Sequence, residues 1–190
     1  PCQSLVYNKN PLNNPRKLVT AGYLEGFYYR PRIDMDLLRE YSEGLICMSA
    51  CLKGVVPEKM LKGDYEGARK EALLFSEIFQ DRYYLEIQNH GIPEEEQNLK
   101  NMKKLSQDLN LPLVCTNDAH YAKKEHWEAH DIHICLGTGK ERSDPNRLRY
   151  ATPEFYFKTQ DQMHKLFKEF PGAIENTSKI AVSIDITLPI

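Results

Sequence analysis

Short apolar runs alternate with longer amphipathic segments through the middle of the chain. Residues 45–51, 82–88 and 113–115 each have the length and apolar content of a buried strand. Between them, over 64–79 and from residue 93 onward, apolar residues recur three and four positions apart, as they do on one face of a helix. Strands that alternate with helices in this way are typical of a parallel α/β arrangement, either an open sheet or a closed barrel.

Local start and stop signals predict further elements on both sides of this alternation. Asp34 and Asp64 are placed to cap helices, and Pro57 and Pro93 stand at helix starts. An earlier helix is expected over 13–30. The remaining predicted elements are a helix over 124–136, a loop over 137–153, a short strand at 155–157, helices at 160–170 and 173–183, and a strand-like run at 184–190.

Polar side chains that can bind metal follow all three central strands. Cys51 ends the first run, His90 follows the second, and Asp118 and His120 follow the third. Active sites of parallel α/β folds lie at the carboxyl ends of the strands. Residues two apart on an extended segment point to the same side, so a carboxylate oxygen and an imidazole nitrogen can meet at one point. This mixture of ligands suits a divalent cation such as zinc.

A purely structural reading stays open for each of these side chains. Asp118 can cap a turn, which would leave His120 on the surface. Cys51 can be a small core residue, and His90 can bond a backbone carbonyl. The D-x-H spacing is short and arises often by chance. The metal hypothesis therefore depends on three strand ends meeting, and not on this motif alone.

Three histidines recur along the predicted helix over 124–136. His126, His130 and His133 fall on one helical face, which is an arrangement that can bind zinc. The H-E-x-x-H pattern of zinc helices is absent, because Glu128 comes two positions after His126 instead of one. We favour an ordinary helix here, with only His130 packed inward.

The predicted loop over 137–153 is rich in basic residues. It carries four of them, with Tyr150 beside them: Lys140, Arg142, Arg147 and Arg149. A basic loop next to an aromatic ring can contact phosphates. More often, such a cluster pairs with acidic neighbours or is solvated, and we favour that reading.

Composition bounds the class of protein. The chain has 190 residues, a formal net charge of −2 and five cysteines without a C-x-x-C pair. Reduced thiols in a cytoplasmic protein are expected from this cysteine usage. No run of about 18 apolar residues occurs, so no membrane span is expected. Binding to DNA would need a local basic patch. The abrupt start and end of the sequence suggest a piece of a longer protein.

Several stretches together resemble one family: EGFYYRPRID, EGLICMSACLKG, YYLEIQNHGIPEE, LPLVCTNDAHY, AHDIHICLGTGK, DPNRLRY, FYFKTQDQM and FPGAIENTSKIA. They are similar to the PHP (polymerase and histidinol phosphatase) domain of bacterial replicative DNA polymerase III alpha subunits of the DnaE type. The resemblance implies an α/β fold, an incomplete PHP-type distorted (β/α) barrel of parallel strands with outer helices. Residues 1–185 would be the later part of the domain, 151–185 its helical end, and 186–190 the start of the connection to the polymerase core.

The resemblance also implies a set of site residues. PHP domains hold several metal ions, zinc or manganese, in a cluster of histidine, carboxylate and cysteine ligands. Cys51, Asp118 and His120 match ligand positions, and His90 and Arg32 match neighbouring positions. The family's earlier ligands would precede this chain, and the magnesium-binding aspartates of the polymerase core would follow it. The isolated fragment is therefore expected to bind metal weakly and to be inactive.

The resemblance implies a fragment of a DNA-directed DNA polymerase whose PHP site acts as a metal-dependent 3′–5′ exonuclease. One alternative is a non-catalytic platform that braces the polymerase and docks a proofreading subunit. Another is a free-standing PHP phosphoesterase. The expected partners are DNA and other replicase subunits, namely the sliding clamp and a separate exonuclease subunit, in the cytoplasm and away from membranes. An incomplete barrel is also expected to expose strand edges that favour self-association.

Overall fold

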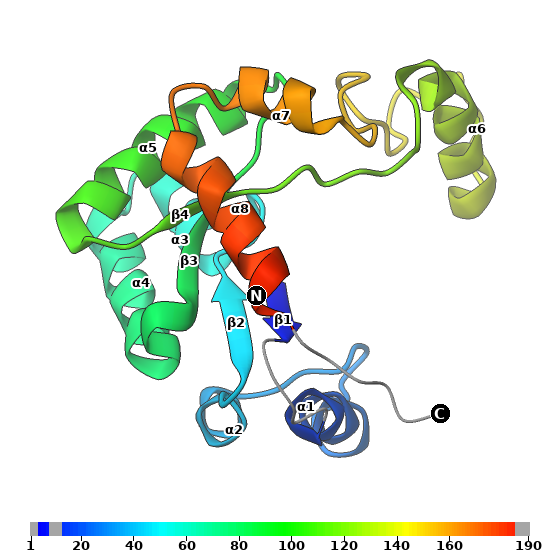
Figure 1. Cartoon of the computed structure of the whole chain (residues 1–190). Coiled ribbons are helices and arrows are strands. Elements are labelled where there is room, and N and C mark those ends of the chain that lie inside the picture. Colours follow the sequence, from blue (N-terminus) through cyan, green and yellow to red (C-terminus); the bar gives the residue numbers. More distant parts are fainter. Residues whose placement is uncertain (1–3, 8–12, 185–190) are drawn as a thin grey trace.

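Three parallel strands and one antiparallel edge strand form the sheet at the centre of the molecule (Figure 1). The computed structural model describes residues 4–7 and 13–184. The strands, in their order across the sheet, are β1 (Ser4–Tyr7), β2 (Leu45–Met48), β3 (Tyr83–Ile87) and β4 (Leu113–Cys115). β2, β3 and β4 run parallel, and β1 runs antiparallel to β2. Within the described residues the sheet does not close into a barrel.

Helices connect the parallel strands. α3 (Val55–Leu61) and α4 (Tyr65–Phe79) lead from β2 to β3, and α5 (Pro93–Leu109) leads from β3 to β4. The first amides of a helix have no partner within it, and the Asp64 carboxylate caps α4 by accepting one of them at 2.9 Å. Pro93 begins α5 and is followed by three glutamates, which the positive end of the helix favours. These crossovers bring the carboxyl ends of all three parallel strands to one edge of the sheet.

The remaining helices lie before and after this unit. They are α1 (Asn13–Leu24), α2 (Met35–Glu40), α6 (Trp127–Thr138), α7 (Gln160–Leu166) and α8 (Pro171–Ser183), with 3₁₀ turns at Gln80–Arg82 and Lys124–His126. α8 packs along β4, whereas Figure 1 shows α6 far from the sheet, beyond an extended segment that follows β4. No helix in the described ranges is long and apolar enough to cross a membrane. The predicted connection at 186–190 lies outside the described residues.

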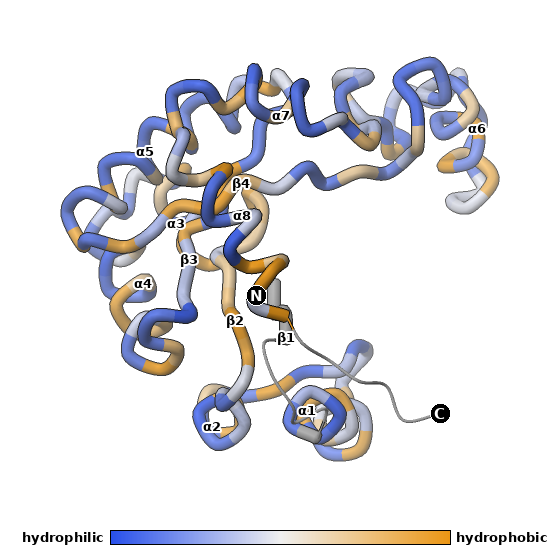
Figure 2. Tube along the Cα trace, viewed as in Figure 1, coloured by the Kyte–Doolittle hydropathy of each residue, from blue (hydrophilic) through white to orange (hydrophobic). Residues whose placement is uncertain are grey.

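Successive strand residues contribute to two apolar clusters, because side chains alternate between the two faces of a sheet along a strand. Figure 2 shows the hydrophobic residues along β2. Tyr83, Leu85 and Ile87 of β3 lie in the larger cluster, with the inner faces of α4 and α5. The smaller cluster consists of Ile46, Met48, Val114 and Ile180, with Tyr84 packed against it. The predicted apolar stripe of α4 is buried at Ala68, Ala72, Phe75 and Phe79. The central strand–helix alternation is thus confirmed.

The first helix is shorter than predicted, because α1 ends at Leu24. Beyond it, Gly26 lies so close to the chain that a Cβ there would stand 2.0 Å from the carbonyl oxygen of Arg32. Tyr29 adopts a φ of 59°, in the left-handed region. A close approach between segments therefore ends the helix before the predicted boundary.

Two predicted strands also differ from the structure. β2 ends at Met48, because Ala50 adopts a φ of 64° through which a strand cannot continue. The run at 155–157 forms an isolated bridge, Tyr121 to Tyr156, instead of a strand. Both differences lie at the carboxyl side of the sheet, where the backbone leaves the ladder.

Candidate functional site

The predicted metal ligands of the third strand end lie in a turn, residues 116–121, which we call the D-x-H turn. Its first amide, from Thr116, still donates to the carbonyl of Ile87 at 3.1 Å and completes the β3–β4 ladder. The chain then leaves the sheet, and Asp118 adopts a φ of 47°. The amide of His120 donates to the carbonyl of Phe155 at 2.7 Å. The turn is therefore bound to β3 on one side and to the loop before α7 on the other.

Asp118 and His120 come together as their spacing predicts. Asp118 Oδ1 lies 3.4 Å from His120 Nε2, and the two side chains are 42% and 35% exposed. A carboxylate oxygen and an imidazole nitrogen thus face one partly open point. Binding of a metal ion at this point stays a prediction.

Aromatic and imidazole rings surround His120. The Tyr150 hydroxyl lies 3.2 Å from each ring nitrogen of His120. Burial, and then the negative charge of Asp118, raise the pKa of Tyr150, so its phenol stays protonated at neutral pH. The ring centroid of His130 lies 5.2 Å from that of Tyr150 and 5.0 Å from that of Tyr121. The site is accordingly lined by hydrogen-bonding rings.

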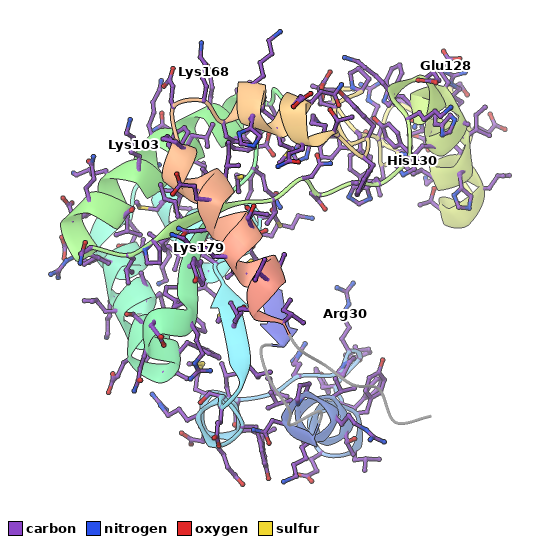
Figure 3. The ribbon with its side chains drawn as sticks, viewed as in Figure 1. Arg30, Lys103, Glu128, His130, Lys168 and Lys179 are labelled. Carbon is purple, nitrogen blue, oxygen red and sulfur yellow. The ribbon has the colours of Figure 1, made fainter. Side chains whose placement is uncertain are left out.

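His130 comes from α6 (Figure 3) and packs inward, as predicted. His126 and His133 are exposed. Burial lowers the pKa of His130 first, and the neighbouring His120 and His133 lower it further. A neutral imidazole is therefore favoured at this position near pH 7. His130 is the residue of the predicted histidine face that reaches the D-x-H turn.

His90 lies behind the D-x-H turn and is fully engaged by protein oxygens. Its ring is 1% exposed, Nδ1 lies 2.6 Å from Glu95 Oε1, and Nε2 lies 2.7 Å from the carbonyl oxygen of Asn117. Both ring nitrogens are thus occupied by hydrogen bonds. His90 is a neighbour of the candidate site, and neither nitrogen is free to bind a metal ion.

Among the described residues, neither Cys51 nor Arg32 forms a group with Asp118 and His120. Cys51 is half-buried in the turn after β2. Among residues 4–7 and 13–184, no three side chains of the His, Cys, Asp and Glu types form a group that could hold a metal ion. Arg32 lines a groove with α1 and with Leu45, at the amino end of β2, and its guanidinium lies 5.5 Å from the centre of the Tyr28 ring. Arg32 is therefore at the opposite end of the strands from the D-x-H turn.

The structure contains a buried polar network at the carboxyl ends of the strands that the sequence analysis does not predict. Glu86 on β3 is 4% exposed. Its Oε1 accepts from Thr116 at 2.5 Å and from Gln88 at 3.3 Å, and its amide donates to Ser49 Oγ at 2.8 Å. The other carboxylate oxygen, Oε2, is buried and has no hydrogen-bond partner in the described structure. The only sequence signal was a charged residue in the apolar run YYLEI.

The basic loop pairs mainly with acidic side chains, as we favoured. Arg147 forms a bidentate pair with Asp131 of α6, at 2.6 and 2.8 Å. Arg142 adds a contact to the same carboxylate at 3.3 Å, and Lys140 pairs with Asp144 at 3.0 Å. The guanidinium of Arg147 holds the pKa of the Asp131 carboxyl below its usual value. The contacts with Asp131 bind the loop to α6. Three of the four basic residues of the loop are paired with carboxylates in this way.

Comparison with known proteins identifies the family. A family model described as PHP domain matches residues 2–90. The DNA polymerase III subunit alpha of Borreliella burgdorferi is 46% identical over 188 residues, which cover 97% of this chain and 16% of that protein. The same subunit of Treponema pallidum is 41% identical over 186 residues, again 97% and 16% of the two chains. The chain belongs to the PHP domain of the DNA polymerase III alpha family.

This PHP chain spans only a small part of its curated relatives. The alpha subunit of Campylobacter jejuni, for example, is 40% identical over 196 residues that cover 96% of this chain and 16% of that protein. The open sheet with three parallel strands is consistent with part of a PHP (β/α) barrel, so the predicted fold class is confirmed.

The side chains at the D-x-H turn are of types that bind a divalent cation, but there are too few of them to complete a metal site. Asp118 and His120 supply one oxygen and one nitrogen, and Tyr150 and His130 lie next to them. Protein zinc sites use three or four protein ligands. The two side chains therefore fit part of a metal site and do not complete one among the described residues, so no reaction step follows from a metal here.

Proposed function

We propose that this chain is the PHP portion of a replicative DNA polymerase, the DNA polymerase III alpha subunit, and that its D-x-H turn contributes to a metal-dependent phosphodiester-cleaving site. The observation that carries the proposal is the 3.4 Å approach of Asp118 and His120 at the carboxyl end of a parallel strand. Similarity to polymerase alpha subunits over 97% of the chain supports it and disfavours a free-standing phosphoesterase. Template-directed DNA synthesis itself, with magnesium, would belong to the remainder of such a polymerase.

In this proposal Asp118 and His120 hold a divalent cation, zinc or manganese, together with ligands from beyond the described residues. Such a cation supplies positive charge that polarises a phosphodiester and lowers the pKa of a bound water. The Tyr150 phenol, protonated at neutral pH, can donate a hydrogen bond to a phosphate oxygen beside His120. Cys51 remains a proposed ligand only if its turn is brought closer in the complete domain.

A second candidate function is a platform for other replicase subunits. Three large apolar side chains of α6 and its following loop are exposed, namely Ile132, Leu136 and Leu148. Another apolar group is exposed after α1, namely Phe27, Tyr28 and Tyr29. Exposed apolar patches of this kind often mark contact surfaces. Either group would contact a replicase subunit, the sliding clamp or a separate exonuclease subunit. DNA would be bound by the whole assembly, in the cytoplasm.

Metal content and nuclease activity of the complete polymerase test the first function. We expect Asp118→Ala and His120→Ala to lose bound zinc or manganese and 3′–5′ cleavage of single-stranded DNA. His126→Ala is the matched control, because His126 is an exposed histidine of the 3₁₀ turn before α6. Unchanged metal and cleavage in the two site variants would remove the D-x-H turn from the site. A complete protein without metal in any form would favour the platform.

A further inference from the structure

We propose that His90 and Glu95 form a positioning pair that fixes the D-x-H turn from behind and so aims Asp118. The pair reaches the turn through a single backbone carbonyl, that of Asn117, which directly precedes Asp118. The mechanical part of this inference stands on the contacts alone. Its consequence for metal binding rests on the proposed function.

The hydrogen bonds around His90 form a chain from a rigid helix to the turn. Glu95 lies in the first turn of α5 and is 3% exposed. Its two carboxylate oxygens contact His90 twice, at Nδ1 at 2.6 Å and at the backbone amide at 2.5 Å. The carbonyl of Asn117 can only accept, so Nε2 of His90 donates to it at 2.7 Å. Glu95 of α5 thus fixes His90, and His90 in turn fixes the carbonyl of Asn117, directly before Asp118.

The loop before α7 closes the arrangement from the other side. The ring of Phe155 stacks on His90, and the carbonyl of Phe155 accepts the amide of His120. Thr152 Oγ1 donates to the carbonyl of His90 at 2.6 Å. The side-chain amide of Asn117 donates to the carbonyl of Tyr156 at 3.1 Å. Asp118 therefore lies between two residues that are fixed by hydrogen bonds: Asn117, through its carbonyl and its side-chain amide, and His120, through its backbone amide.

The conformation of Asp118 explains why such a restraint is needed. A φ of 47° is unfavourable for a residue with a Cβ and persists where the surroundings fix the backbone. A released turn would relax toward ordinary φ values, and the Asp118 carboxylate would move away from His120. Two buried side chains that share hydrogen bonds in this way do more than fill space, because each oxygen and nitrogen has a specified partner.

Two substitutions, each of which can replace one of the two ring nitrogens, separate positioning from packing. In His90→Gln, the side-chain nitrogen can take the place of Nε2 and keep the donation to Asn117. In His90→Asn, the shorter amide nitrogen takes the place of Nδ1, which keeps the contact with Glu95 and loses the contact with Asn117. Both variants remove the ring stacked on Phe155. A packing role predicts similar behaviour for the two, and a positioning role predicts a difference.

Hydrogen–deuterium exchange of the complete polymerase is the direct measurement. In His90→Asn we expect the amides of His120 and Tyr121 to exchange about tenfold faster or more, because a buried hydrogen bond of this class is lost. In His90→Gln they should stay within about threefold of the wild-type rate. The Thr116 amide, held by Ile87, is the internal control and should be unchanged in both. Equal exchange at 120–121 in wild type and His90→Asn, or equal acceleration in both variants, would overturn the positioning role.

Titration of the same proteins with Mn²⁺ separates this inference from the proposed function. If His120→Ala and His90→Asn both weaken Mn²⁺ binding while His90→Gln does not, the pair aims a metal ligand. If His120→Ala has no effect, the proposed metal site fails, and the exchange result alone decides the positioning role. If His120→Ala weakens binding and His90→Asn does not, the pair does not aim Asp118.

Discussion

The imidazole of His90 lies flat against the phenyl ring of Phe155, with ring centroids 4.0 Å apart and planes 5° apart. His90 follows β3, whereas Phe155 belongs to the loop before α7. Phe155 also meets Tyr150 and His120 edge-on, at centroid distances of 4.6 and 5.9 Å. One ring therefore joins the buried histidine to the candidate site.

Replacing Phe155 by alanine should lower the free energy of unfolding by about 3 kcal/mol, because a buried ring and its stacking contacts are lost. Urea denaturation followed by circular dichroism measures this change. Phe157→Ala is the control, since that ring is 73% exposed and should change stability by about 0.5 kcal/mol or less. A similar loss in both variants would mean that the Phe155 contacts add nothing.

Replacing Glu86 by glutamine should raise the free energy of unfolding by about 1 kcal/mol. The glutamine oxygen can keep the hydrogen bonds from Thr116 and Gln88, while a neutral amide nitrogen takes the place of the unpaired Oε2 and the buried negative charge is removed. Urea denaturation at pH 7 is the measurement. Glu169→Gln, at an exposed position outside the helices, is the control. A clear loss of stability would show that Glu86 Oε2 has a favourable partner.

Replacing Asp131 by asparagine should destabilise the chain by about 2 kcal/mol at pH 7, because a bidentate pair with Arg147 is lost. The folded protein lowers the pKa of Asp131 below its ordinary value of 3.8. The stabilisation is therefore present above that ordinary value and disappears as the pH falls through the lower, folded value. Unfolding of wild type and variant between pH 7 and pH 2 should show a difference that is constant near neutrality and vanishes in acid.

The control for this pair is Glu128→Gln. Glu128 is 70% exposed and lies 3.6 Å from Arg142, so its loss should be barely measurable and should not depend on pH in this way. A difference between wild type and Asp131→Asn that grows in acid would contradict the assigned direction of the pKa change.

Substitutions at Asp118 should separate backbone strain from ligand chemistry. Glycine tolerates a φ of 47° and alanine does not, so Asp118→Gly should be more stable than Asp118→Ala by about 1 kcal/mol. Thermal unfolding compares the two variants. Both lack the carboxylate, so both should lose the proposed metal binding. Equal stability would mean that the turn relaxes without cost.

The central fold was predictable because its signals are local. Apolar runs, the caps at Asp34 and Asp64 and the proline start of α5 all lie within a few residues of the elements they define. The end of α1 was not predictable in this way, since it depends on the contact between Gly26 and Arg32. The isolated bridge at Tyr156 likewise depends on a distant partner.

The candidate site was predictable in part. The approach of Asp118 to His120 follows from their spacing, and the inward position of His130 follows from the helical pattern. A backbone carbonyl as a partner of His90 was one reading left open, and the structure has one. The identities of Glu95 and Asn117 did not follow from the sequence, because they reach His90 only through the folded connection between β3 and β4. The sequence predicts that basic residues of the loop pair with acidic neighbours. That Arg147 pairs with Asp131 in particular is known only from the structure.

α8 occupies the outer edge of β4 with side chains in place of another strand. Asn176 Nδ2 donates to the carbonyl of Leu113 at 2.8 Å, and Thr177 Oγ1 donates to the carbonyl of Cys115 at 2.9 Å. Alternate carbonyls of a parallel strand point away from its neighbour, so these two would otherwise accept amides from an incoming strand. α8 therefore occupies the two carbonyls through which another strand would add to β4. Aggregation by strand addition is disfavoured at this edge of the sheet.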